Sequence, residues 1–245
     1  MDLSKYKMRV TDTHVYFWGG PFSQWFTGRF EGELPVYRGP SGDRPARLVR
    51  SGSALPFTSG EKYMMASKSS VFGDVGKGSS LEAIMGSGLL FGETEPPKDT
   101  PEYRRFRHGT DDVRKIKEIG RTVPGLAGGR WDEDDIAFWT RASVPAVTLG
   151  NLYKFTRSDA LYDVLMRMGD RRFVEGSPKD TIWGVGLSFD DPRIGDESKW
   201  KGSNRLGDII GNVRDIVVEH GRDIDPWKVL SRALRQAPAS HVPSP

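Results

Sequence analysis

Hydrophobic and polar residues first follow the pattern of strands and later that of helices. Residues 11–18 are rich in β-branched and aromatic side chains and are followed by a Gly-Gly-Pro sequence, which predicts a strand that ends in a turn. Shorter extended segments are expected at 27–30 and 46–49. The chain before residue 59 is therefore expected to be mostly sheet.

After Ser59 the apolar residues recur at helical spacing. Ser59 is a favourable N-cap residue and Glu61 places an acid in the first turn, so a helix is predicted from 59 to about 70. A further short strand is expected at 172–175. More helices are expected at 79 or 80 to 86, 111–120, 132–155 with an interruption or kink near Pro145, 158–168, 204–220 and from 225 onward.

These elements predict an α+β fold, mostly helical with a small sheet, in a single domain. The 245 residues are enough for one large core. We expect residues 1–10 to form an N-terminal extension, residues 11–236 to form the domain, and residues 237–245 to be a disordered tail. Within the domain, the charged and proline-containing segment 93–110 is expected to be an inserted surface loop.

Composition narrows the class of protein. Hydrophobic residues make up 36% of the chain without a long apolar run, and the N-terminus lacks the apolar core of a secretion signal, so we expect a cytoplasmic protein with no membrane partner. The net charge of +3 favours phosphate-bearing substrates but falls short of a dedicated nucleic-acid surface. The sequence does not give an oligomeric state.

Metal chemistry has little support in the sequence. There is no cysteine, which excludes disulfides and thiolate-bound metals. The four histidines are scattered, at 14, 108, 220 and 241, and no pair has the spacing of metal ligands. We therefore expect no metal ligands, although a carboxylate-bound magnesium or calcium ion is left open.

Two distant segments concentrate the residues of a candidate sugar site. The first is 59–68, in which helical spacing places Glu61 and Lys68 on one face about two turns apart. The second is 174–186, which contains acidic residues, a tryptophan and glycines and is followed by the helix start at 203–207. If the two segments meet, they bring together a carboxylate, an aromatic face and an anion-binding helix end.

These motifs identify a family. The chain resembles the NADAR, or YbiA-like, superfamily of N-glycosidases over about residues 12–219. The family has asparagine where this chain has Gln24, histidine at Lys62 and threonine at Met168, and Lys62 could add a positive charge beside the site. The matching motifs are Pro21–Trp25, Glu61–Lys68, Gly120-Arg121, Trp131, Lys154-Phe155, Gly169-Asp170, Val174–Pro178, Asp180, Trp183–Gly186 and Asn204–Gly207.

The resemblance implies a hydrolase that cleaves a ribose C1–N bond and needs no cofactor. One implied substrate is ADP-ribose linked to guanine in nucleic acid, which makes ADP-ribosylated DNA or RNA the expected partner. The other is a phosphoribosylamino-pyrimidine intermediate of riboflavin synthesis. We favour the first because the net positive charge of the chain and the additional loop at 93–110 suit a larger anionic substrate. A non-catalytic reader of ADP-ribose is the third alternative.

Three residues are candidates for catalysis. Glu61 could stabilise the positive charge that forms on ribose when the bond breaks, although a first-turn acid also complements the helix dipole. Lys68 could hold the Glu61 carboxylate or bind a ribose hydroxyl or a phosphate, and it could equally be a solvated helix lysine. Asp180 could be a second acid or position the ribose, or bond turn amides.

Several of the candidate binding residues, namely Arg121, Trp131, Trp183, Ser203 and Asn204, have a structural alternative as well. A core or capping role would explain the aromatic residues and the helix start, and a salt bridge would explain the arginine. Phe22 and Ser23 would line the pocket, and Arg121 would pair with a diphosphate. Trp131 and Trp183 would stack on a base or sugar, and Gly184 and Gly186 would let backbone approach the ligand. Ser203 and Asn204 would bind phosphate at the helix N-terminus.

Overall fold

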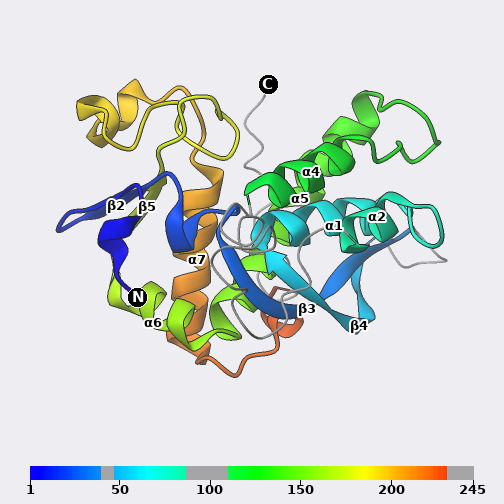
Figure 1. The fold of residues 1–245 in the computed structure, drawn as a ribbon, viewed down its shortest axis with the longest axis horizontal. Helices are drawn as coiled ribbons and strands as arrows, with labels where there is room; N and C mark the ends of the chain where they lie inside the picture. The colour runs from blue at the N-terminus through cyan, green and yellow to red at the C-terminus, as the bar shows by residue number, and fades with distance from the viewer. Residues whose placement is uncertain (40–46, 87–109, 231–245) are drawn as a thin grey trace, which may run out of the picture.

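The computed structural model describes residues 1–39, 47–86 and 110–230 and confirms the α+β class. In Figure 1 strands β2 and β5 lie on one side of the molecule and the β3–β4 hairpin on the other, with helix α7 between them. Among the described residues, no helix has the length and apolar character needed to cross a membrane. Residues 93–109 of the expected loop and all of the expected tail lie outside the described part, whereas Thr110 begins a helix.

A three-stranded sheet joins the N-terminal region to the second candidate segment. Its strands are β1 (Met8–Val10), β2 (His14–Phe17) and β5 (Arg172–Glu175), in the order β1-β2-β5. Strands β2 and β5 are parallel, with Phe17 opposite Glu175. Because parallel strands run in the same direction, the residues that follow Phe17 and Glu175 emerge at the same edge of the sheet.

A long antiparallel hairpin forms the second sheet and differs from the short extended segments predicted. Strand β3 spans Thr27–Arg38 and strand β4 spans Arg47–Ser59. Pro35, Pro56 and several glycines interrupt the apolar alternation, so the pattern indicates only fragments of these strands. In a two-stranded ribbon each strand has a free edge, where a missing N–H donor is tolerated.

Helices form the rest of the described chain. Ser59 caps α1 as predicted, because its Oγ accepts a hydrogen bond from the Lys62 amide at 3.1 Å. Of the interruption or kink predicted near Pro145, the interruption is wrong, because α5 runs through it. Residues 145–156 are all buried, and their packing offsets the lost hydrogen bond. The bounds are α1 (Gly60–Val71), α2 (Ser80–Gly86), α4 (Thr110–Arg121), α5 (Glu133–Thr156), α6 (Asp159–Arg167) and α7 (Arg205–His220), and residues 226–230 are also helical.

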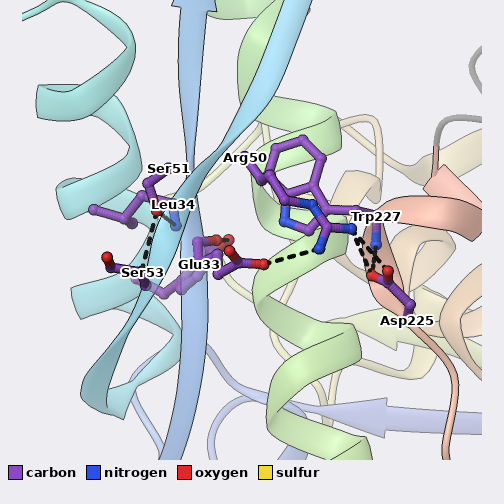
Figure 2. A network of polar contacts seen from close by, with 8 residues as sticks. Glu33, Leu34, Arg50, Ser51, Ser53, Asp225 and Trp227 are labelled. Atoms are coloured by element: carbon purple, nitrogen blue, oxygen red, sulfur yellow. Dashed lines mark hydrogen bonds and ion pairs between the residues drawn. The ribbon is translucent and has the colours of Figure 1, made fainter.

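The segment after α7 docks on the hairpin through Arg50. Figure 2 shows the Arg50 guanidinium between Glu33 of β3 and Asp225. It donates to both carboxylate oxygens of Asp225 at 2.8 and 3.0 Å, and it lies 3.4 Å from Glu33. A cavity of about 760 Å³ lies beside this network, but the Arg50 charge there is already neutralised by the two carboxylates. Arg50 thus serves to hold the segment after α7 against the hairpin.

Candidate active site

A larger cavity, of about 860 Å³, opens where β2 and β5 end. Two carboxyl groups, Glu175 and Asp180, line it, together with the lysines Lys7, Lys117 and Lys179. A volume of this size accommodates a nucleotide-sized ligand. The cavity therefore combines acid–base groups with positive charge at the edge of the parallel sheet.

Glu175 is the most strongly perturbed acid in the cavity wall. It ends β5, and its Oε2 is buried without a hydrogen-bond partner among the described residues. Burial raises the pKa of Glu175 to about 8, and the negative charges of Asp180 and Glu61 raise it further, while Lys117 opposes them. The Glu175 carboxyl group is therefore mostly protonated at neutral pH.

Glu61 lies directly behind the cavity wall, in the first turn of α1. Its side chain is only 2% exposed, and its Oε1 lies 3.7 Å from Nζ of Lys117. Burial raises the pKa of Glu61, whereas the charge of Lys117 and a hydrogen bond with the Trp25 side chain lower it. Lys117 and Trp25 both line the cavity, so a single layer of side chains separates Glu61 from the space beyond.

Lys117 was missed in the sequence, and it links the two acids. It lies on α4, where Val113, Ile116 and Gly120 on the same face are buried. A lysine four residues after Val113 places a cation within the apolar stripe, which is the signal that would have found it. Glu175 was missed as a site residue as well, because the sequence marks it only as a member of the Val174–Pro178 motif.

Asp180 has the turn role that was its structural alternative, and it also lies in the cavity wall. Its Oδ1 accepts hydrogen bonds from the amides of Ile182 and Trp183 at 3.0 and 2.8 Å, which is the turn arrangement. The residue also lines the cavity, and its charge raises the pKa of both Glu61 and Glu175. The turn thus fixes an anion beside the two glutamates.

Lys68 does not hold the Glu61 carboxylate, which corrects that part of the prediction. Its Nζ donates to the carbonyl oxygen of Gly120 at 2.8 Å and lies 4.1 Å from the centre of the Trp131 ring. Burial, followed by the charge of Arg121, lowers the pKa of Lys68 to about 8. Two helical turns separate Lys68 from Glu61 along α1, so Lys117 on the neighbouring helix takes the place expected for it.

The predicted aromatic binding residues do not line the cavity. Phe22 is fully buried among Phe17, Phe155 and Phe173. Trp131 donates from Nε1 to the Val123 carbonyl and stacks on Phe72, with ring centres 4.4 Å apart. Trp183 packs, partly buried, against the main core. The aromatic wall is formed instead by Trp18, Trp25 and Phe26.

The glycines at 184 and 186 serve the packing of the chain itself. A Cβ on Gly184 would lie 2.9 Å from the Glu175 carbonyl oxygen and 3.1 Å from that of Asp180. Gly186 has a φ of +70°, a conformation that side chains disfavour, and a Cβ there would approach Lys201. The space expected for a ligand is therefore occupied by the protein's own chain.

The start of α7 supports Glu175. Asn204 is fully buried; its Oδ1 accepts from the Glu175 amide at 3.0 Å and its Nδ2 donates to the Phe173 carbonyl at 2.9 Å. The Ser203 hydroxyl donates to the Ile182 carbonyl. Both side chains bond to protein backbone and neither lines the cavity, so the structure does not show the predicted phosphate site. Asn204 instead anchors the strand that carries Glu175.

The remaining predicted residues divide between the cavity and its surroundings. Ser23 lines the cavity, as expected, and its carbonyl accepts a hydrogen bond from Nζ of the buried Lys154 at 2.9 Å. Arg121 is exposed at the end of α4 and is not among the cavity residues, although its charge lowers the pKa of Glu61. Lys62 is not among the cavity residues, and its Nζ donates to the carbonyl oxygen of Met85 in α2.

Within the described part of the chain, no group of three histidine, aspartate or glutamate side chains is arranged to hold a metal ion. The residues that line the cavity include two acids, three lysines, three aromatic residues and three residues with hydroxyl groups. This set suits proton transfer and the binding of an anionic, aromatic ligand.

Comparison with known proteins gives matches along most of the sequence. Residues 16–218 match the NADAR domain. The chain is 30% identical over 213 residues to N-glycosidase R617 of Acanthamoeba polyphaga mimivirus, covering 84% of this chain and 96% of that protein. It is 29% identical over 161 residues to Protein irg-1 of Caenorhabditis elegans, covering 66% of this chain and 61% of that protein.

Proposed function

The chain belongs to the NADAR family, and we propose that it is an N-glycosidase that hydrolyses the ribose C1–N bond of ADP-ribose linked to guanine in nucleic acid. The family and the identity to a named N-glycosidase support glycosidase activity. The proposed substrate is the one that the family resemblance implies, and a cavity that contains three lysines and has room for a nucleotide supports it.

The observation that carries the proposal is the difference between the two buried glutamates. Burial raises the pKa of Glu61 too, and its Oε1 lacks a hydrogen-bond partner among the described residues. A cation 3.7 Å from Oε1 and a hydrogen bond from Trp25 act in the opposite direction and favour its ionised form. Glu175 lacks a partner for its Oε2 and lies near two other acids, which favours its protonated form. Neighbouring acids with opposite protonation are what a glycosidase requires.

The two acids then divide the reaction. As the C1–N bond breaks, protonated Glu175 gives its proton to the leaving nitrogen, and ionised Glu61 stabilises the positive charge on the ribose ring. Water adds its oxygen to C1, and Glu61 takes the proton that this water loses. The products are the free ribose hydroxyl and the free amine of the base, so atoms and charge balance.

Access to Glu61 depends on Lys117. The Lys117 side chain lines the cavity and is 33% exposed, whereas the glutamate it pairs with is buried. A substrate phosphate or hydroxyl competes with Glu61 for the ammonium group, and the flexible lysine stem can rotate towards it. In this mechanism substrate binding exposes Glu61 to the ribose.

Product analysis tests the proposal. Wild-type protein is incubated with an oligonucleotide carrying ADP-ribosylated guanine and, separately, with the phosphoribosylamino-pyrimidine, and released ADP-ribose and ribose 5-phosphate are quantified. We expect release of ADP-ribose, with Glu118→Gln, an exposed acid on α4, as a control of unchanged activity. Release of ribose 5-phosphate alone would contradict the proposal and identify the phosphoribosylamino-pyrimidine as the substrate. Binding of ADP-ribose without turnover of either compound would indicate a non-catalytic reader.

A further inference from the structure

Trp18 is a large aromatic residue left exposed at the mouth of the cavity. Its side chain is 44% exposed, although it immediately follows the buried strand β2. Its amide donates to the Lys7 carbonyl at 2.9 Å, and Nζ of Lys7 lies 4.4 Å from the centre of the indole ring. Both residues line the cavity. An exposed indole held beside a cation is a platform on which a base can stack.

The register of the sheet places this platform beside the proposed reaction centre. Phe17 is paired with Glu175 across the parallel strands, and Trp18 is the next residue. Neighbouring strands are about 4.8 Å apart. The register brings the backbone of Trp18 next to the end of β5, and the side chains of Trp18 and Glu175 line the same cavity. A ligand whose reacting ribose lies at Glu175 can therefore place its adjoining groups against the indole.

The charges around Trp18 favour an anionic linker. Lys7 and Lys179 are exposed on the cavity wall, and Lys117 lies deeper, next to Glu61. Asp180 supplies a negative charge, while Glu175 is mostly neutral at pH 7 because burial raises its pKa to about 8. The wall consequently carries an excess of positive charge, which suits a diphosphate.

We propose that Trp18, Lys7 and Lys179 form a subsite for the adenosine diphosphate part of the substrate, in which the purine stacks on the exposed indole and the two ammonium groups bind the diphosphate. The subsite rests on the proposed function, because it assigns the distal half of that substrate. It also supplies a reason for the enzyme to distinguish an ADP-ribosyl group from a ribose 5-phosphate group.

Calorimetric titration of ADP-ribose and of ribose 5-phosphate tests the subsite. We expect the wild-type protein to bind ADP-ribose at least about tenfold more tightly, since stacking of one base contributes about 5- to 150-fold. Trp18→Ala should lose a factor in this range for ADP-ribose and change ribose 5-phosphate affinity less than about twofold. Trp18→Phe should retain most of the affinity. Equal wild-type affinities for the two ligands, or an unaffected Trp18→Ala variant, would overturn the subsite.

The lysines have their own test. Lys7→Ala and Lys179→Ala should each weaken ADP-ribose binding and reduce its dependence on salt, whereas Lys115→Ala, an exposed lysine on α4 away from the cavity wall, should do neither. Equal effects of all three would overturn the assignment of the diphosphate. A protein that binds ADP-ribose through Trp18 yet cleaves no glycoside would support the subsite and contradict the proposed function.

Discussion

Glu61 and Glu175 are the same type of residue, and their surroundings make them chemically different. Burial and the charge of Asp180 raise the pKa of both, and the charge of Lys117 lowers the pKa of both. The ammonium group lies 3.7 Å from Oε1 of Glu61, whereas the pKa of Glu175 is also raised by the charge of Glu61. A cation favours the charged form of a carboxyl group, and neighbouring anions favour the neutral form. In the proposed mechanism this difference makes Glu61 the base and Glu175 the acid.

The pH dependence of catalysis should report this pair. We predict a bell-shaped profile of kcat/KM, in which activity falls below the pKa of Glu61 as this group gains a proton, and falls above about pH 8 as Glu175 loses its proton. Glu175→Gln should abolish the alkaline fall and reduce the maximum by about 10²- to 10⁴-fold. An unchanged alkaline fall in this variant, with Glu118→Gln as control, would contradict the assignment of Glu175 as the acid.

Lys117 should control the acidic side of the same profile. Lys117→Met removes the positive charge next to Glu61, so the pKa of Glu61 should rise and the acidic fall in kcat/KM should move to higher pH. Lys115→Met, two residues away and exposed, should leave the profile unchanged. If Lys117→Met leaves the acidic fall at its wild-type position, the ion pair does not set the protonation of Glu61.

Residue identities were predictable only where a motif marked them. Glu61, Asp180 and Ser23 were chosen by family resemblance, and Asp180 and Ser23 do line the cavity. Lys117 belongs to a helix predicted from its apolar spacing alone, and nothing in that spacing reveals an acid on a neighbouring helix. Phe22 and Trp131 carry the same side chains in a core as in a binding site, so sequence could not decide between the two roles.

At the level of elements, the junction of β5 and α7 determines where Glu175 lies. A Cβ on Gly207 would overlap the Phe173 carbonyl oxygen and the Asn204 side chain. Gly207→Ala should therefore destabilise the fold by about 1 to 3 kcal/mol and lower activity, because Asn204 holds the Glu175 amide.

The same helix contains the matched control. A Cβ on Gly211 would meet no atom within 4 Å, so Gly211→Ala should raise stability by about 0.5 to 1 kcal/mol. Urea unfolding of the two variants measures the difference. Equal stabilities would show that the close contact at Gly207 does not constrain α7.

Elements whose signals are local were predicted well. Helices α1, α4 and α7 start and end close to the expected residues, because caps, glycines and apolar spacing all lie within each segment. The β3–β4 hairpin was found only in fragments, because its strands stabilise each other through pairing between residues up to 32 positions apart, such as Thr27 and Ser59. Such pairing leaves little trace in a local pattern.

At the level of the whole molecule, Lys154 should couple folding to pH. It is fully buried, and burial lowers its pKa to about 7 from an ordinary value of 10.5. Between these values the unfolded chain binds the proton and the folded chain does not, so the contribution of Lys154 to stability is complete above pH 10.5 and is lost as the pH falls to about 7.

Chemical denaturation at pH 7 and pH 9 measures this coupling. The free energy of unfolding of the wild-type protein should rise by about 2 kcal/mol relative to that of Lys154→Met over this interval. Taking the difference between the two proteins removes the contribution of other titrating groups. Parallel changes in both proteins would show that Lys154 is charged in the folded state, and Lys115→Met serves as the exposed control.

The meeting of distant segments is the property that sequence patterns could not supply. The charge of Asp180 acts on Glu61, and the charge of Glu61 acts on Glu175, although more than a hundred residues separate Glu61 from the other two along the chain. Family resemblance predicted that the two segments share a site. The actual contacts depend on the parallel pairing of β2 with β5 and on the packing of α4 against α1.

The rate of glycoside cleavage by Glu61→Gln tests the central claim most directly. Single-turnover release of ADP-ribose from ADP-ribosylated guanine is compared between this variant and the wild-type protein, after circular dichroism has shown that both are folded. The proposed mechanism predicts a loss of at least about 10²- to 10⁴-fold in rate, with Glu118→Gln unchanged. Wild-type activity in folded Glu61→Gln would contradict it.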